Sequence, residues 1–171
     1  MLNLNESLND NLSLEQRIAR LEDIEAIKQL KYQYARYCDN HYDPDGIASL
    51  FIPDGHWLVT GIGGEATGHD EIKKHFVAAS KDIVWVVHYI TSPEIVIASD
   101  GNSAIGKFYL NCLATIINKN DRSQENAVVM TGNYVDHFVK VNGKWYFKKL
   151  SGAITQASEW TDGWVRKPWI D

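Results

Sequence analysis

A histidine inside an apolar stretch is the clearest sign of chemistry in this sequence. His88 lies in the run 82–90, which is otherwise rich in β-branched and aromatic residues, a composition typical of a buried strand. Asp39 ends a tyrosine-rich segment with a helical pattern, residues 31–39, and is a candidate partner for His88. A carboxylate bonded to one imidazole nitrogen leaves the other nitrogen free to accept a proton, so the pair could act as a general base.

Simpler structural interpretations of the same residues stay open. His88 could be a core histidine bonded to a backbone carbonyl, and Asp39 could merely end a helix. The two positions are 88 − 39 = 49 apart, so only the fold can bring them together. Tyr34 lies on the inward stripe of the same helical segment. Its phenol could hydrogen-bond a substrate oxygen or simply pack in the core.

Length and composition restrict the class of protein. The chain has 171 residues, which fits one domain. Its formal net charge is −5 and its basic residues form no cluster, which argues against nucleic-acid binding. No apolar run approaches the roughly 20 residues of a membrane span. Two cysteines, Cys38 and Cys112, form no motif, as in reduced intracellular proteins. We therefore expect a cytoplasmic protein that binds neither nucleic acid nor membrane.

No recognised metal or cofactor motif is present. The remaining histidines form no His-x-His, His-Glu-x-x-His or Cys/His pattern; they are His41, His56, His69, His75 and His137. The pattern Gly-x-Ser-x-Gly is absent, and the glycines of 61–64 are too few for a dinucleotide-binding loop. We expect no metal and no cofactor.

Helical patterns dominate the first half of the chain. Ser13 and Gln16 form a capping box before apolar residues spaced three or four apart, which predicts a helix to about Asp39. Asp43-Pro44 predicts the start of a short helix that stops near Pro53. A third helix is expected from Asp70.

One strand is predicted between the second and third helices, and the others follow the third helix. They are expected at 56–60, 84–89, 94–98, 103–117, 127–141 and 144–154. Asp100-Gly101 and Asn142-Gly143 are typical of type I′ hairpin turns. Together these elements predict an α+β fold in which N-terminal helices pack on one face of a strongly curved antiparallel sheet that encloses an apolar pocket.

We expect three regions: a flexible tail at 1–12, the domain at 13–158 and a tryptophan-rich tail at 159–171. Trp160, Trp164 and Trp169 could cover the pocket, or could dock on the barrel or on a neighbouring subunit.

Several segments resemble a known family. Residues 24–34, with Asp39 behind them, resemble the first helix of SnoaL-like proteins in the nuclear transport factor 2-like superfamily. Segments 54–57 and 61–63 resemble its hexachlorocyclohexane dehydrochlorinase branch, and 87–89, 132–134 and 142–145 continue the match. The resemblance spans about residues 14–160. The helix motif is also similar to bile acid 7α-dehydratase, and scytalone dehydratase belongs to the same group.

The resemblance implies a cone-shaped barrel and a mechanism. In the lyases of the group, a His–Asp pair removes a proton from carbon while water or halide leaves. These positions match His88 and Asp39, and the pocket tyrosine of the bile acid enzyme falls on Tyr34. Two features depart from the pattern: Cys112 stands where the bile acid enzyme has an aspartate, and residues 150–154 contain no arginine. The substrate is therefore expected to be neither a bile acid derivative nor a chlorinated cyclohexane.

We accordingly expect a cofactor-independent lyase, of dehydratase type, acting on a small hydrophobic cyclic or polyketide-like molecule. His88, Asp39 and Tyr34 are the expected catalytic residues. The expected pocket residues are Trp57, Tyr37, Asn111, Cys112 and Tyr134. The alternatives are an isomerase or cyclase with the same base, a non-catalytic binding domain of the same fold, and a small subunit of a larger oxygenase. The aromatic tail favours a homodimer or homotrimer.

Overall fold

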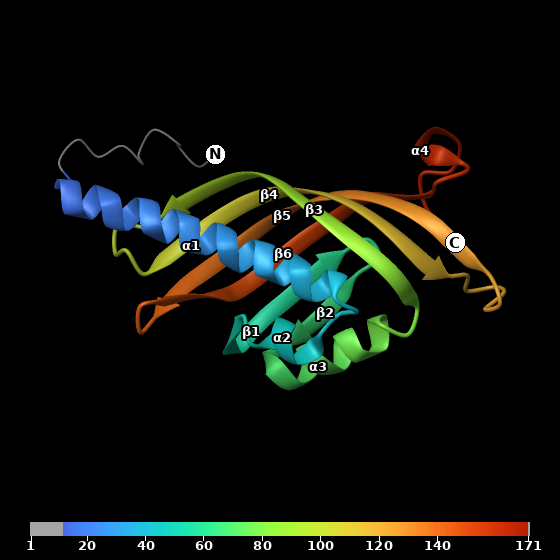
Figure 1. Ribbon diagram of the computed structural model, residues 1–171, viewed down its shortest axis with the longest axis horizontal. Coiled ribbons are helices and arrows are strands. Elements are labelled where there is room, and N and C mark those ends of the chain that lie inside the picture. The colour runs from blue at the N-terminus through green and yellow to red at the C-terminus, as the bar shows by residue number, and fades with distance from the viewer. Residues whose placement is uncertain (1–11, 171) are drawn as a thin grey trace.

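One curved six-stranded sheet forms the centre of the molecule, with a long helix lying across it, two shorter helices near one edge and a third short helix away from that edge (Figure 1). The computed structural model describes residues 12–170. The helices are α1 (Leu14–Asp39), α2 (Pro44–Ala48), α3 (Gly68–Ala79) and α4 (Gly163–Arg166). The strands are β1 (Phe51–Thr60), β2 (Gly64–Thr67), β3 (Ile83–Ile97), β4 (Ser103–Ile117), β5 (Glu125–Val141) and β6 (Lys144–Glu159). The predicted α+β class is confirmed, whereas the predicted tail at 1–12 lies almost wholly outside the described residues.

Helix α1 has the predicted start and end. The Ser13 hydroxyl accepts from the Gln16 backbone N–H, and the Gln16 side chain accepts from the Ser13 backbone N–H, which completes the capping box. The first turns carry apolar residues that remain exposed, such as Leu14 and Leu21. Ile24 is partly buried against the core, and fully buried positions run from Ile27 to Cys38, so the C-terminal half of α1 contributes most to the core.

The strand order is β2-β1-β6-β5-β4-β3. Strands β3 to β6 form the predicted antiparallel meander. Strand β1 pairs in parallel with β6, so the sheet is not antiparallel throughout. After β2, helix α3 connects the chain to β3 at the opposite edge of the sheet. The strands β4, β5 and β6 then add one after another until β6 lies beside β1, and this path makes β1 and β6 parallel.

Some predicted boundaries differ from the structure. The expected strands at 84–89 and 94–98 are one long strand, β3, with an irregularity between Thr91 and Glu94. The glycines at 61–64 indicate a hairpin or a loop, and the structure has a hairpin there: β1 turns into the short strand β2, which was not predicted and pairs with β1. Helix α2 stops at Ala48, and Pro53 lies within β1.

The two predicted turns have different conformations. Asn142 and Gly143 have φ values of 50° and 79°, as a type I′ turn requires. At Asp100-Gly101 only the glycine has a positive φ, so the type I′ prediction is wrong there. The Asp100 carboxylate instead accepts from the backbone N–H groups of Asn102 and Ser103, and this local capping replaces the need for a second left-handed residue.

A fully buried ion pair joins α1 to the sheet. Lys31 Nζ lies 2.8 Å from Asp136 Oδ2, and both side chains are completely buried. The ammonium also lies 3.2 Å from the centre of the Tyr134 ring, a cation–π contact. Burial lowers the pKa of Lys31 and raises that of Asp136. Their mutual attraction opposes both shifts, and the pair fixes α1 relative to β5.

Candidate active site

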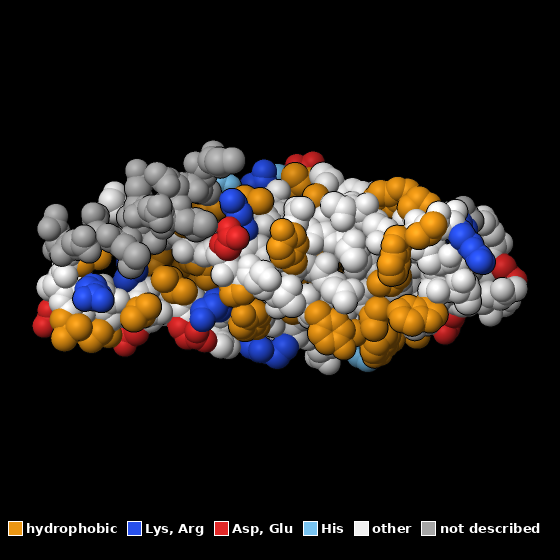
Figure 2. Space-filling view, turned by 90° about the horizontal axis from the view of Figure 1, so that it is seen from above, with side chains coloured by type: hydrophobic (Ala, Val, Ile, Leu, Met, Phe, Trp, Pro, Cys, Tyr) orange, Lys and Arg blue, Asp and Glu red, His pale blue; other side chains and the backbone are white. Residues whose placement is uncertain are grey.

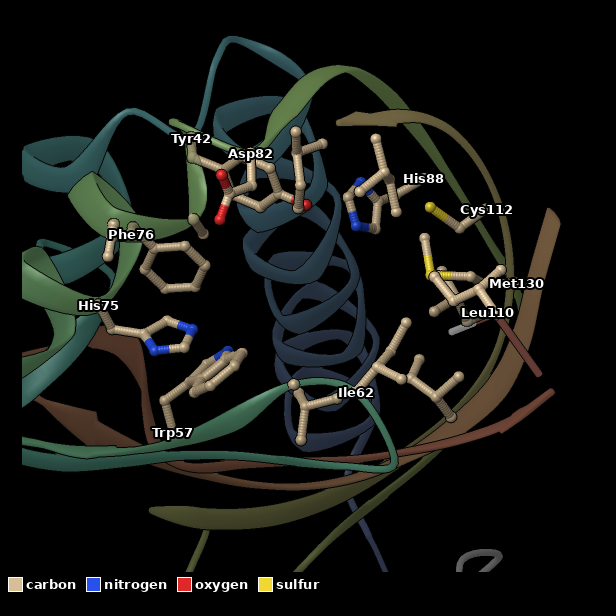
Figure 3. Close-up of a pocket in the computed structure, with 18 of the residues that line it drawn as sticks. Tyr42, Trp57, Ile62, His75, Phe76, Asp82, His88, Leu110, Cys112 and Met130 are labelled. Carbon is tan, nitrogen blue, oxygen red and sulfur yellow. The ribbon is translucent and has the colours of Figure 1, made fainter. Parts of the chain in front are cut away.

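A cavity of about 380 Å³ lies between α1, α3 and the inner face of the sheet (Figure 3). Its walls are mainly aromatic and aliphatic, with few polar groups. The volume falls in the lower part of the range of small-molecule sites, roughly 300–1,000 Å³. An occupant of this space would be small and mostly apolar.

His88 and Asp39 meet at one side of this cavity. The His88 ring nitrogen Nδ1 lies 2.7 Å from Asp39 Oδ1, and the same oxygen accepts from the His88 backbone N–H at 3.0 Å. Because an ionised carboxylate only accepts hydrogen bonds, Nδ1 carries the proton. The lone pair is then on Nε2, and the His88 ring lines the cavity. The His88 and Asp39 side chains are 9% and 29% exposed.

The fold explains how two residues so distant in the chain come together. Asp39 is the last residue of α1, which packs against β3. Along β3, Val86 is buried and Tyr89 is exposed, so His88 falls on the same inner side as Val86. The C-terminal end of α1 therefore places the Asp39 carboxylate against the inner face of β3.

Tyr34 and Trp57 form a second polar contact in the cavity wall. The Trp57 indole Nε1–H donates to the Tyr34 hydroxyl oxygen at 2.9 Å, and both residues are buried. Burial raises the pKa of Tyr34 well above its ordinary value, so the phenol keeps its proton. The oxygen accepts from Trp57, and the hydroxyl also hydrogen-bonds the buried Cys38 thiol, so a substrate oxygen that accepts from Tyr34 would replace the weak acceptor Cys38.

Cys112 and Tyr134 also line the cavity. Cys112 lies directly opposite His88 in the pairing of β3 with β4, and burial raises the pKa of its thiol to about 12. The thiol is therefore neutral and does not supply the charge of an aspartate. Tyr134 is buried on β5 and its ring contacts the Lys31 ammonium; burial raises its pKa as well.

Two of the expected pocket residues lie elsewhere. The Asn111 side chain is exposed on the outer face of β4, because its neighbours Leu110 and Cys112 point inward. Tyr37 is partly buried at the edge of the core, where its ring lies against Gly46 of α2. Neither residue lines the cavity.

The tryptophan-rich tail does not supply a tryptophan lid. Trp160 and Trp164 are mostly exposed, and the cavity is lined instead by Ile170 from this segment. The tail is held by the backbone of Ala157, which donates to Pro168 and accepts from Ile170. From this tail, it is therefore Ile170, not Trp160 or Trp164, that forms part of the cavity wall.

The sequence did not single out Tyr42 or His75 as pocket residues. Tyr42 follows Asp39 by three positions, in a left-handed conformation with φ 54°. Its ring meets His88 edge-on, with centroids 6.3 Å apart, and stacks on Phe76 at 5.6 Å. The sequence feature that could have pointed to Tyr42 is the Asp-x-x-Tyr spacing at the end of α1. This spacing does not indicate the turn that brings the Tyr42 ring against His88.

Among residues 12–170, no three His, Cys, Asp or Glu side chains come close enough together to hold a metal ion. No described helix has the length and apolar character needed to cross a membrane.

Comparison with known families identifies the domain. The model of the SnoaL-like domain matches residues 19–151, most of the chain. The chain belongs to the SnoaL-like domain family. The matched range contains both members of the His88–Asp39 pair, Tyr34 and strands β1 to β5, and it ends within β6. It stops before the tryptophan-rich tail. A search of curated proteins found no match.

Solved structures with different names share this SnoaL-like fold. A candidate scytalone dehydratase from Novosphingobium aromaticivorans is 22% identical, with a TM-score of 0.72 over 84% of this chain and 91% of that chain. The hexachlorocyclohexane dehydrochlorinase LinA-type3 from Novosphingobium barchaimii is 20% identical, with a TM-score of 0.73 over 84% and 93%. A candidate aromatic ring hydroxylase from N. aromaticivorans is 23% identical, with a TM-score of 0.71 over 83% and 96%. At these identities the likeness shows the fold, and function must be argued from the site.

Proposed function

We propose that this SnoaL-like protein is a cofactor-independent lyase of dehydratase type, acting on a small hydrophobic cyclic or polyketide-like molecule. The observation that carries the proposal is the 2.7 Å hydrogen bond between His88 Nδ1 and Asp39 Oδ1 beside an apolar cavity. This bond fixes the tautomer in which Nε2 can accept a proton.

His88 is the base in this proposal. Nε2 takes a proton from a substrate carbon, and the electron pair of the broken C–H bond forms the new carbon–carbon double bond. The neighbouring C–O bond breaks and its electrons leave with the oxygen. Asp39 stabilises the imidazolium, whose proton then returns to the departing hydroxide, so that the products are an alkene and water. General-base catalysis of this kind contributes about 10²–10⁴-fold.

Tyr34 is the proposed donor to the leaving oxygen or to a substrate carbonyl. Its hydroxyl oxygen accepts from Trp57, which polarises the O–H bond and strengthens it as a donor. No arginine lies in the segment 150–154, and the Cys112 thiol is neutral. Lys119 also lines the cavity, but the proposed donor itself, the Tyr34 hydroxyl, is neutral, an arrangement that suits an uncharged substrate.

The same geometry supports a second reaction class. An isomerase or cyclase would use the same proton abstraction at His88 and would return the proton to a different carbon. The neutral Cys112 thiol and the lack of an arginine at 150–154 also favour an alternative function, a domain that binds a small molecule without turnover. The three functions differ in what happens to a bound ring compound, and one experiment separates them.

That experiment offers the protein a panel of hydroxylated cyclic ketones and follows loss of water by mass spectrometry. A dehydratase gives a product lighter by one water, an isomerase or cyclase gives an isomer of equal mass, and a binder returns the compound unchanged. For any compound that reacts, His88→Gln should lower turnover at least about 10²-fold. His56→Gln is the control, since His56 bonds Glu65 outside the cavity. Undiminished turnover in His88→Gln would remove His88 as the base.

We also propose that the chain forms a homodimer or homotrimer. The face seen in Figure 2 carries hydrophobic side chains that gather toward the end where α4 lies in Figure 1. Among the exposed aromatic side chains, Trp85, Tyr109 and Trp160 are each more than half exposed, and large exposed apolar surface marks interaction sites. Light scattering on the full chain measures the mass directly, and a monomer at micromolar concentration would overturn this proposal.

A further inference from the structure

Two imidazoles face the cavity from opposite sides. His88 and Cys112 lie on the side formed by β3 and β4, and His75 lies with Trp57 and Phe76 on the side formed by α3 and β1 (Figure 3). His88 has its carboxylate. The proposed reaction gives His75 no task, although it is the second ring in the wall that can both donate and accept a hydrogen bond.

The His75 ring is held in place by apolar contacts. Its centroid lies 4.3 Å from the Trp57 ring and 5.1 Å from the Phe76 ring, the latter at an interplanar angle of 88°. On another side lies Gly64, where an added Cβ would come within 3.0 Å of His75 Cε1. The absence of a side chain at Gly64 therefore leaves the space that the ring edge fills. These contacts fix the ring without using its nitrogen atoms.

His75 has no polar partner within residues 12–170. Burial alone shifts its pKa, which is lowered, whereas His56 and His69 each bond an oxygen. The neutral ring presents one N–H donor and one acceptor in apolar surroundings. The ring is only partly buried, so solvent reaches it in the empty cavity. An apolar ligand that displaces this solvent would leave the ring nitrogens unpaired, whereas a ligand oxygen would restore a hydrogen bond. A site built in this way discriminates against ligands that lack the matching group.

We infer that His75 is a specificity-determining residue that hydrogen-bonds an oxygen at the end of the ligand remote from His88. The ligand class that follows is a neutral ring compound with two oxygen functions at opposite ends, joined by an apolar body that contacts Phe76 and Leu110. Which end reacts rests on the proposed function. The hydrogen bond at His75 requires only that a ligand occupies the cavity.

The test uses two probes with the same carbon frame, 1-tetralone and 6-hydroxy-1-tetralone, which differ by a hydroxyl at the far end of the bicycle. Titration calorimetry on the full chain should give roughly tenfold tighter binding of the hydroxylated probe, the size of one net hydrogen bond. In His75→Phe, which keeps the ring contacts, the ratio of the two dissociation constants should fall to about one. His75→Gln, which keeps a donor and an acceptor, should retain part of the preference, and His56→Phe should retain all of it.

The outcomes separate this inference from the proposed function. His88→Gln should keep the preference for the hydroxylated probe even if it abolishes every turnover. A preference that survives in His75→Phe, or that disappears in His88→Gln, would overturn the role of His75. Equal or undetectable binding of both probes by the wild-type protein would overturn it too. Loss of the preference in His75→Phe, with an unchanged circular dichroism spectrum, supports the inference whether or not the protein has lyase activity.

Discussion

A single carboxylate oxygen of Asp39 accepts two hydrogen bonds from His88, one from the ring Nδ1 at 2.7 Å and one from the backbone N–H at 3.0 Å. The backbone bond ties the end of α1 to β3, and the ring bond orients the imidazole. Because one atom does both, movement of the helix end would change the orientation of the ring. The structural bond and the proposed catalytic bond are therefore not independent.

Tyr34→Phe should keep the fold and lose activity. The substitution removes the hydroxyl that we propose as donor to the leaving oxygen, and it leaves the Trp57 N–H without its partner. For any substrate that the panel identifies, kcat should fall about 10²-fold, the usual effect of removing one such donor. Trp57→Phe keeps the Tyr34 hydroxyl and should lower kcat less. An unchanged kcat in Tyr34→Phe, which keeps the ring, would show that Tyr34 acts through packing alone.

Breaking the buried ion pair should destabilise the protein strongly. Lys31→Met leaves the Asp136 carboxylate buried without a cation, and loss of one partner of such a pair costs about 3–5 kcal/mol in the free energy of unfolding. The double variant Lys31→Met/Asp136→Leu should recover most of this loss, since it buries no charge. Urea unfolding of both single variants and the double variant gives the coupling energy. Additive losses would contradict a direct pairing in the core.

His75 should make the protein less stable in mild acid. Burial lowers its pKa below the ordinary 6.5, so as the pH falls through about 6.5 the unfolded chain takes up a proton before the folded protein does. The contribution of His75 to stability is therefore complete above about pH 6.5 and is lost as the pH falls toward the lowered folded pKa. Urea unfolding between pH 5 and 7.5 should show a smaller decline in His75→Phe than in the wild-type protein. Identical declines would mean that His75 titrates normally.

The helices and the meander could be predicted because their signals are local. The capping box at Ser13 and the spacing of apolar residues mark α1, and alternating burial marks β4 to β6. The parallel pairing of β1 with β6 and the short strand β2 depend on where α3 carries the chain. That path is set by tertiary packing, which periodicity does not record.

Some residues of the candidate site could likewise be predicted from the sequence, and others could not. His88, Asp39 and Tyr34 were identified by residue type and by family resemblance, and strand alternation around Cys112 places Asn111 on the outer face. Tyr42 was missed because a left-handed turn directs its ring toward His88. The role inferred for His75 depends on the lack of a polar partner for it among residues 12–170, a property that only the folded surroundings define.

The most direct test of the account is the protonation of the His88 ring, measured by nitrogen-15 NMR of the folded protein with labelled histidine at neutral pH or above. We predict that Nδ1 carries the proton and Nε2 is unprotonated, and that Asp39→Asn weakens this preference. A wild-type spectrum in which Nε2 carries the proton would leave no lone pair directed at the cavity, and would contradict His88 as the base.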